Sequence, residues 1–196
     1  MKLYLIRHGQ SETNLRKCFT GWAQVDLTEQ GRADAENVRS MLGGIAFDKI
    51  YASDLIRAMH TAEIALPGCE YETTPLLREV GMGSLELQPI AEVEADMLAK
   101  NTRELGYAMY GGESKEQLRQ RAKDFLELVQ SQNYGKVAAF SHWGFIGAVL
   151  DQVFGINLPK MKMVCKNCTV GILEYEKEQW KLHSWINPDN NIEESI

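Results

Sequence analysis

The sequence predicts an α/β fold, a three-layer sandwich in which a mostly parallel central sheet carries helices on both faces. Two apolar runs, at 2–6 and 136–140, have the length and composition of buried strands. Patterns typical of amphipathic helices alternate with strand-like runs along the chain, which favours a sheet covered on both faces. No linker or repeat divides the 196 residues, so we expect a single domain spanning 1–196.

The first half of the chain alternates two strands with two helices. The run at 2–6 ends in a glycine-containing segment, as a buried strand would. Thr28 is a suitable N-cap for a helix over 28–42. Residues 45–52 have β character, and Ser53 is the expected cap of the helix that follows.

The second half is less regular between 69 and 113 and regular again beyond it. Ser114 and Gln117 form a capping-box signature at the start of a helix with one apolar face. The other expected elements are strands at 71–74, 136–140, 170–175 and 180–185, and helices at 90–100, 103–110 and 144–154.

Composition and charge exclude several classes of protein. The chain has 21 basic and 27 acidic residues, a net charge of -6, whereas nucleic-acid and anionic-membrane binders need a basic face. Cys165 and Cys168 form a lone CxxC that precedes a β-like run, so we expect ordinary reduced thiols among the four cysteines and no metal. No apolar stretch matches a secretory signal or a membrane span, which indicates a cytoplasmic protein.

Two histidines follow predicted strands directly. His8 and His142 lie at carboxyl ends, where ligands bind in sheets of this kind. A histidine at a strand end is more often structural than catalytic when it has no partners. Here Arg7 precedes His8, and Ser11 and Asn14 follow in the next loop, which supplies donors suited to an anion.

Two further segments carry charged groups at the start of a helix or loop. Arg57 falls in the first turn of a predicted helix, where its guanidinium could join the helix N-terminus in holding a phosphate. A surface ion pair with Asp54 is the simpler interpretation of Arg57 taken alone. Glu79 opens a loop, and Arg78 is its only obvious cationic neighbour.

Taken in order, these motifs resemble the histidine phosphatase superfamily, in particular the small phosphatases of its phosphoglycerate mutase-like branch. The matching segments are 5–14, 27–31, 53–62, 77–79, 111–114 and 141–142. The opening motif is moderately specific alone. The whole set, colinear from residue 3 to about 175, is highly specific.

The resemblance implies a phosphatase in which His8 is the nucleophile and Glu79 the general acid. It assigns the catalytic phosphate pocket to Arg7, Asn14, Arg57 and His142. Burial beside two arginines should lower the pKa of His8 and keep it neutral. We expect His142 to be protonated and to meet transition-state charge together with the guanidinium groups, so that no metal or other cofactor is required.

The sequence departs from the family pattern in three places, of which Gln10 is an accepted variant that changes little. Trp143 and Leu87 stand where many members have glycine, which questions the shape of the pocket wall and of one loop. Residues 80–115 are expected to form a small cap insert that chooses the substrate. Ser11, Trp22 and Trp143 are the candidate substrate-binding residues.

Three alternatives stay open at this point. Phosphoglycerate mutase-type transfer would use the same phosphohistidine, but the interval from Glu79 to His142 is short for a mutase. A non-catalytic phosphate-binding protein of this fold is the second. A metal-dependent hydrolase using His8 and His142 as ligands lacks the carboxylates it would need. The expected substrate is a small phosphorylated metabolite with a neutral or partly apolar leaving group; the sequence predicts no oligomeric state.

Overall fold

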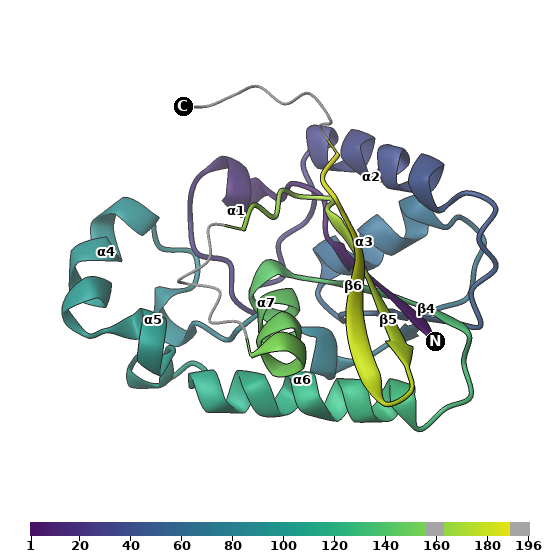
Figure 1. The fold of residues 1–196 in the computed structure, drawn as a ribbon. Coiled ribbons are helices and arrows are strands. Elements are labelled where there is room, and N and C mark those ends of the chain that lie inside the picture. The colour runs from purple at the N-terminus through teal and green to yellow at the C-terminus, as the bar shows by residue number, and fades with distance from the viewer. Residues whose placement is uncertain (156–162, 189–196) are drawn as a thin grey trace.

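The computed structural model describes residues 1–155 and 163–188, and within these ranges one six-stranded sheet forms the centre of the molecule (Figure 1). Its order is β3-β2-β4-β1-β5-β6. The strands are β1 (Lys2–Arg7), β2 (Lys49–Ala52), β3 (Glu72–Thr73), β4 (Lys136–Ser141), β5 (Val170–Glu176) and β6 (Gln179–Ile186).

The pairing of the strands brings the two candidate histidines together. β3, β2, β4 and β1 are mutually parallel, while β5 and β6 add an antiparallel edge, as in the mostly parallel sheet that was predicted. In the register of β1 and β4, Arg7 lies opposite Ser141. His8 and His142 therefore leave neighbouring strands at the same end of the sheet.

Helices cover both faces, which confirms the three-layer prediction. The helices are α1 (Glu12–Leu15), α2 (Glu29–Leu42), α3 (Ile56–Ala65), α4 (Ile90–Ala99), α5 (Thr102–Leu105), α6 (Lys115–Gln130) and α7 (Trp143–Phe154), with 3-10 turns η1 (Pro75–Leu77), η2 (Gly83–Leu85) and η3 (Ala108–Tyr110). Leu3 and Leu5 of β1 lie in an apolar cluster with α6 and α7. Tyr4 and Ile6 point the other way and lie in a cluster with α2 and α3, because side chains alternate along a strand.

Local capping chemistry agrees with the sequence at two helices and differs at a third. The Thr28 hydroxyl accepts a hydrogen bond from the Gly31 amide, and Ser114 and Gln117 form the predicted capping box. The prediction that Ser53 caps α3 is wrong. Leu55 is the residue at that position, and the Ser53 hydroxyl instead accepts from the Leu55 amide within the turn that precedes the helix.

The segment that precedes α4 is tied to the loop after α1. The Phe19 amide donates to the Gln88 carbonyl, and the Leu87 amide donates back to the Phe19 carbonyl. Leu87 adopts a φ of +68°, a left-handed conformation that favours glycine. α4 and α5 lie to one side of the sandwich in Figure 1. A capping role for residues 80–115 stays a prediction.

Candidate active site

His8 lies at the end of β1 with 3% of its surface exposed, and its hydrogen bonds fix which ring nitrogen carries the proton. Nδ1 is 2.6 Å from the Gly9 carbonyl oxygen, which can only accept. Nδ1 is therefore the protonated nitrogen, by assignment from the hydrogen-bond network. Nε2 accepts a hydrogen bond from Nε of Arg57 at 3.3 Å. Nε2 is the nitrogen that could act as a nucleophile.

The electrostatic surroundings of His8 favour the neutral imidazole. Burial is the main cause of a pKa well below the usual range, and the positive charges of Arg57 and Arg7 lower it further. The hydrogen bond to Gly9 acts weakly in the opposite direction. This is the direction that the sequence predicted, and a neutral ring is the form that can donate an electron pair.

Arg57 is fully buried in the first turn of α3. Its guanidinium donates to the carbonyl oxygens of Ala23, at 3.0 Å, and Gly21, at 2.9 Å. The surface pair with Asp54 is excluded, because that carboxylate forms a two-pronged pair with Arg78 at 2.6 and 2.7 Å. Burial lowers the pKa of Arg57 to about 10, although the charges of Glu79 and Glu86 oppose the shift.

His142 is fully buried, and neither ring nitrogen has a hydrogen-bond partner among the described residues. Its ring centroid lies 5.0 Å from that of His8. The buried Nε of Arg7 is unpartnered in the same way. Buried polar groups are almost always satisfied in native proteins, so a cluster of this kind indicates a binding site for a polar group.

The surroundings of His142 favour the neutral ring, and the expectation that it is protonated when it meets the charge of a phosphate stays a prediction. Burial lowers its pKa well below the usual range, and the charges nearby that act on it, chiefly Arg57, are cationic. The family resemblance could not reveal this, because the protonation state depends on which groups surround the ring. A neutral His142 can still donate one hydrogen bond to an anion.

Asn14 and Ser11 are held by the N-terminus of α1. The Ser11 hydroxyl caps this helix by accepting from the Asn14 amide, and the Asn14 Oδ1 accepts from the Ser11 amide at 3.1 Å. Asn167, which the sequence gave no reason to select, donates its side-chain amide to Asn14 Oδ1 and to the carbonyls of His8 and Gly9. Asn14 thus keeps its own NH₂ group available toward a phosphate. Ser11 is fully buried in its capping role, and its contact with substrate stays a prediction.

Glu79 places its carboxylate against the first turn of α7, beside the histidine pair. Oε1 accepts from the Val80 amide at 2.9 Å. A Cβ atom at Gly144 would lie 2.1 Å from the same Oε1, so the carboxylate occupies space that only glycine leaves free. Gly144 is two residues beyond His142 in the chain. The structure therefore brings Glu79 to the same edge of the sheet as His8, Arg57 and His142.

Trp22 and Trp143 occupy different surroundings. The Trp22 Nε1 donates to the Glu79 carbonyl at 2.7 Å, and its ring stacks on the Arg78 guanidinium 5.0 Å away. The Trp143 ring packs against Trp185 of β6, with centroids 6.3 Å apart. A bulky residue at 143 is therefore accommodated by the final hairpin. Its role in substrate binding stays a prediction.

Comparisons with known proteins decide the family. The model of the histidine phosphatase superfamily (branch 1) matches residues 3–188. The chain belongs to this superfamily. It is 28% identical over 168 residues to adenosylcobalamin/alpha-ribazole phosphatase of Escherichia coli, with 82% of this chain and 83% of that one covered. It is 27% identical over 194 residues to a probable phosphoglycerate mutase of Proteus mirabilis, with 95% and 90% covered.

A solved structure supports the same assignment. A mycobacterial glucosyl-3-phosphoglycerate phosphatase in complex with VO3 superposes with a TM-score of 0.83 at 27% identity, covering 94% of this chain and 98% of that one. Superfamily members among these relatives are named as phosphatases or mutases, which supports a phosphomonoester hydrolase as the class of enzyme.

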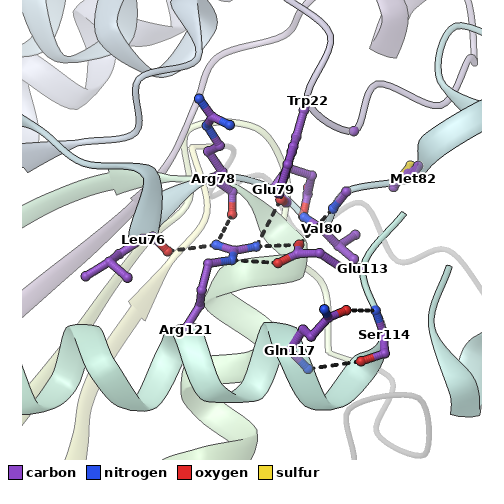
Figure 2. A network of polar contacts seen from close by, with 12 residues as sticks. Trp22, Leu76, Arg78, Glu79, Val80, Met82, Glu113, Ser114, Gln117 and Arg121 are labelled. Carbon is purple, nitrogen blue, oxygen red and sulfur yellow. Dashed lines mark hydrogen bonds and ion pairs between the residues drawn. The ribbon is translucent and has the colours of Figure 1, made fainter. Parts of the chain in front are cut away.

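An ion-paired network that the sequence did not reveal holds the loop carrying Glu79 (Figure 2). Arg121 of α6 and Glu113 are joined at 2.7 and 2.8 Å. Arg121 also donates to the carbonyls of Leu76, Arg78 and Glu79. The motif at 111–114 was the only signal for Glu113, and no local pattern could relate Arg121 to a loop more than forty residues earlier.

The cysteines and the other titratable groups offer no metal site within the described ranges, where no cluster of three His, Cys, Asp or Glu side chains is suitably placed. Cys165 and Cys168 are free, and burial raises the pKa of their thiols to about 11 and about 12. They are therefore protonated thiols. The Cys165 carbonyl accepts a hydrogen bond from Arg7 and so helps to place that guanidinium.

No described helix is long and apolar enough to span a membrane.

Proposed function

We propose that this protein is a phosphatase that hydrolyses a small-molecule phosphomonoester through a phosphohistidine on His8. One observation carries the proposal. Nε2 of a neutral, buried His8 accepts from Arg57 at the edge where Arg7 and His142 also lie, and none of these groups forms an ion pair with a carboxylate among the described residues. A phosphoryl group supplies the negative charge and the acceptor oxygens that such a site needs.

The chemistry follows from the positions of these groups. Nε2 of His8 attacks phosphorus in line with the leaving oxygen, the P–O bond to the alcohol breaks, and Glu79 protonates the departing oxygen. Arg7, Arg57 and His142 donate to the three equatorial oxygens as charge develops there. Glu79 then takes a proton from water, which attacks phosphorus and breaks the P–N bond. His8 is released in its original neutral form.

Hydrolysis is favoured over transfer to a second substrate by the relatives that are named as phosphatases. Chain length does not decide between the two activities, because the probable phosphoglycerate mutase aligns over 95% of this chain and 90% of its own. The relatives include enzymes named for both activities, so release of inorganic phosphate must be measured directly. The relatives named as phosphatases include an adenosylcobalamin/alpha-ribazole phosphatase and a glucosyl-3-phosphoglycerate phosphatase. We infer a monophosphate with a neutral or partly apolar leaving group, acted on by a cytoplasmic enzyme. Faster turnover of sugar bisphosphates than of all aryl and nucleoside-like monophosphates would contradict this substrate class.

The test is hydrolysis of p-nitrophenyl phosphate between pH 5 and 8 in the presence of EDTA. We expect His8-dependent turnover, with His8→Ala reducing kcat by at least about 1000-fold, as for other nucleophiles. His183→Ala, which removes an exposed histidine on β6, is the matched control and should keep full activity.

Three results would contradict the proposal. Absence of turnover together with tight phosphate binding would indicate a non-catalytic binding protein. Full activity of His8→Ala would exclude His8 as the nucleophile. Loss of activity in EDTA would indicate a metal-dependent hydrolase instead.

A further inference from the structure

Glu79 must present its carboxyl group to a leaving oxygen, yet it lies in a loop. Its backbone carbonyl is fixed from two sides. Trp22 donates to this oxygen through Nε1 at 2.7 Å, and Arg121 donates to it through Nη2 at 3.1 Å. Figure 2 shows both side chains converging on this residue, one from the loop after α1 and one from α6.

Arg121 is itself held in a single orientation. Its Nη1 donates to the carbonyls of Leu76 and Arg78 at 2.7 and 2.8 Å. Its Nε and Nη2 pair with both oxygens of Glu113, which are largely shielded from solvent. Glu113 also accepts from the Gly81 amide at 2.8 Å. Arg121 and Glu113 therefore hold the loop on both sides of Glu79. Lysine cannot reproduce the planar set of donors that the Arg121 guanidinium provides.

The carboxylate end of Glu79 is limited by sterics. The Gly144 Cα faces Oε1 so closely that an added methyl group would displace the carboxylate. Gly144 lies in the first turn of α7, so its position relative to Glu79 is fixed by the helix. The backbone of Glu79 is therefore held by Trp22 and Arg121, and its carboxylate is confined by Gly144. These three residues come from separate parts of the chain.

We propose that Arg121, Trp22 and Gly144 are positioning residues for general acid catalysis by Glu79, an inference that rests on the proposed function. A general acid acts only within hydrogen-bond reach of the oxygen it protonates, and small displacements are costly. Loss of positioning should therefore slow the cleavage of esters whose leaving group needs a proton. Cleavage of esters whose leaving group is stable as an anion should be little affected.

The experiment compares kcat/KM for phenyl phosphate and for p-nitrophenyl phosphate, because this ratio reports the step in which the ester bond breaks. The variants are Gly144→Ala, Trp22→Phe and Arg121→Lys. Trp22→Phe keeps an aromatic ring over Arg78 and removes only the donor. We expect kcat/KM for phenyl phosphate to fall at least about 10-fold in Gly144→Ala and Arg121→Lys, and about 3-fold or more in Trp22→Phe, within the range of general acid catalysis. For p-nitrophenyl phosphate the fall should be smaller in every case.

The matched control is Arg119→Lys on the same helix, whose partner is Asp151 rather than the loop. It should leave both esters unaffected. Inhibition by inorganic phosphate should be unchanged in all variants, because the phosphate pocket is intact. Thermal melting identifies any variant that fails to fold. If Arg121→Lys fails to fold, Gly144→Ala and Trp22→Phe still test the proposal.

Equal losses for the two esters, or no loss for either, would overturn the positioning role while wild type still shows His8-dependent turnover. Failure of the proposed function would look different. Wild type itself would then show no His8-dependent turnover of either ester.

Discussion

At the scale of single residues, the site is defined by charges and polar atoms that the protein leaves uncompensated. Arg57 is fully buried, and its guanidinium is met by backbone carbonyls and by the His8 ring. Both nitrogens of His142 are buried without a partner. Burying such groups costs free energy, and strongly perturbed groups in proteins cluster at functional sites. An anion bound between them accounts for the arrangement.

Arg57→Lys tests this account of the buried charge. Lysine keeps the positive charge but cannot donate at once to Ala23, Gly21 and an anion next to His8. We expect kcat for p-nitrophenyl phosphate to fall about 100- to 1000-fold, the range seen when one preorganised donor is removed from a transition state. Inorganic phosphate should also inhibit more weakly. Arg32→Lys, in an exposed pair with Asp26, should behave like wild type, and a similar loss there would contradict the argument.

Residue-level reasoning from sequence succeeded where function depends on position along an element. His8 and His142 were predicted to lie at the same edge because each follows a strand, whereas Arg57 was placed with them only by the family resemblance. The lowered pKa of His142 was not predicted, because only the folded structure shows that the ring is fully buried and that Arg57 acts on it. Asn167 and Arg121 were missed for a related reason. Their partners are far away in the sequence, so no local pattern marks them.

At the scale of elements, the turn before α4 contains a residue in an unfavourable conformation. Leu87 has a φ of +68°, so its backbone is strained. Its side chain is half exposed, so it buries little apolar surface. We expect Leu87→Gly to raise the free energy of unfolding by about 0.5–1 kcal/mol, the relief of left-handed strain less the extra backbone entropy of glycine. Urea unfolding measures this. Leu98→Gly, at an exposed position inside α4, should lower stability by about 1 kcal/mol.

The capping box of α6 gives a second prediction for this scale. Ser114 accepts from the Gln117 amide, and Gln117 returns a hydrogen bond to the Ser114 amide. Ser114→Ala should lower the free energy of unfolding by about 1 kcal/mol. An unchanged urea midpoint would contradict a stabilising cap.

Elements were predicted well where their boundaries depend on local chemistry. Thr28 and Ser114 carry caps that can be read from neighbouring residues. Ser53 was assigned a cap it does not form, because the helix begins two residues later and the Ser53 hydroxyl accepts from the Leu55 amide before it. The last two strands were placed correctly, and Lys177 and Glu178, both at positive φ, lie in the turn that joins β5 to β6.

At the scale of the whole molecule, parallel pairing of β1 with β4 concentrates positive charge at one edge of an acidic protein. The net charge is -6, yet Arg7 and Arg57 meet beside two histidines. The sheet order places these groups together although they come from distant parts of the chain. The alternation of strands and helices predicted this edge as the binding site.

Global stability should depend on pH through the buried histidines. Folding lowers the pKa of His8 and His142 well below the value of about 6.5 expected in the unfolded chain. The unfolded state therefore binds more protons as the pH falls below about 6.5, and the free energy of unfolding should decrease there while staying constant above it. Urea unfolding from pH 7.5 to 5 measures this slope.

The matching variant is His142→Gln, which removes one of the two groups and should make the slope shallower. His183→Gln, at an exposed position, should leave it unchanged. An identical slope in wild type and His142→Gln would contradict the assignment of a neutral, buried His142.

The central claim is that a phosphoryl group is transferred to His8. p-Nitrophenolate leaves without a proton, so Glu79→Gln should slow phosphoryl transfer from p-nitrophenyl phosphate to His8 only slightly. The same variant should slow the attack of water on the phosphohistidine much more, so the intermediate should accumulate. Rapid quenching at alkaline pH followed by peptide mass spectrometry identifies the modified residue. We predict an acid-labile phosphoryl group on the peptide that contains His8 and none in the His8→Ala, Glu79→Gln double variant. A phosphoryl group on any other residue, or on the double variant, would contradict the account.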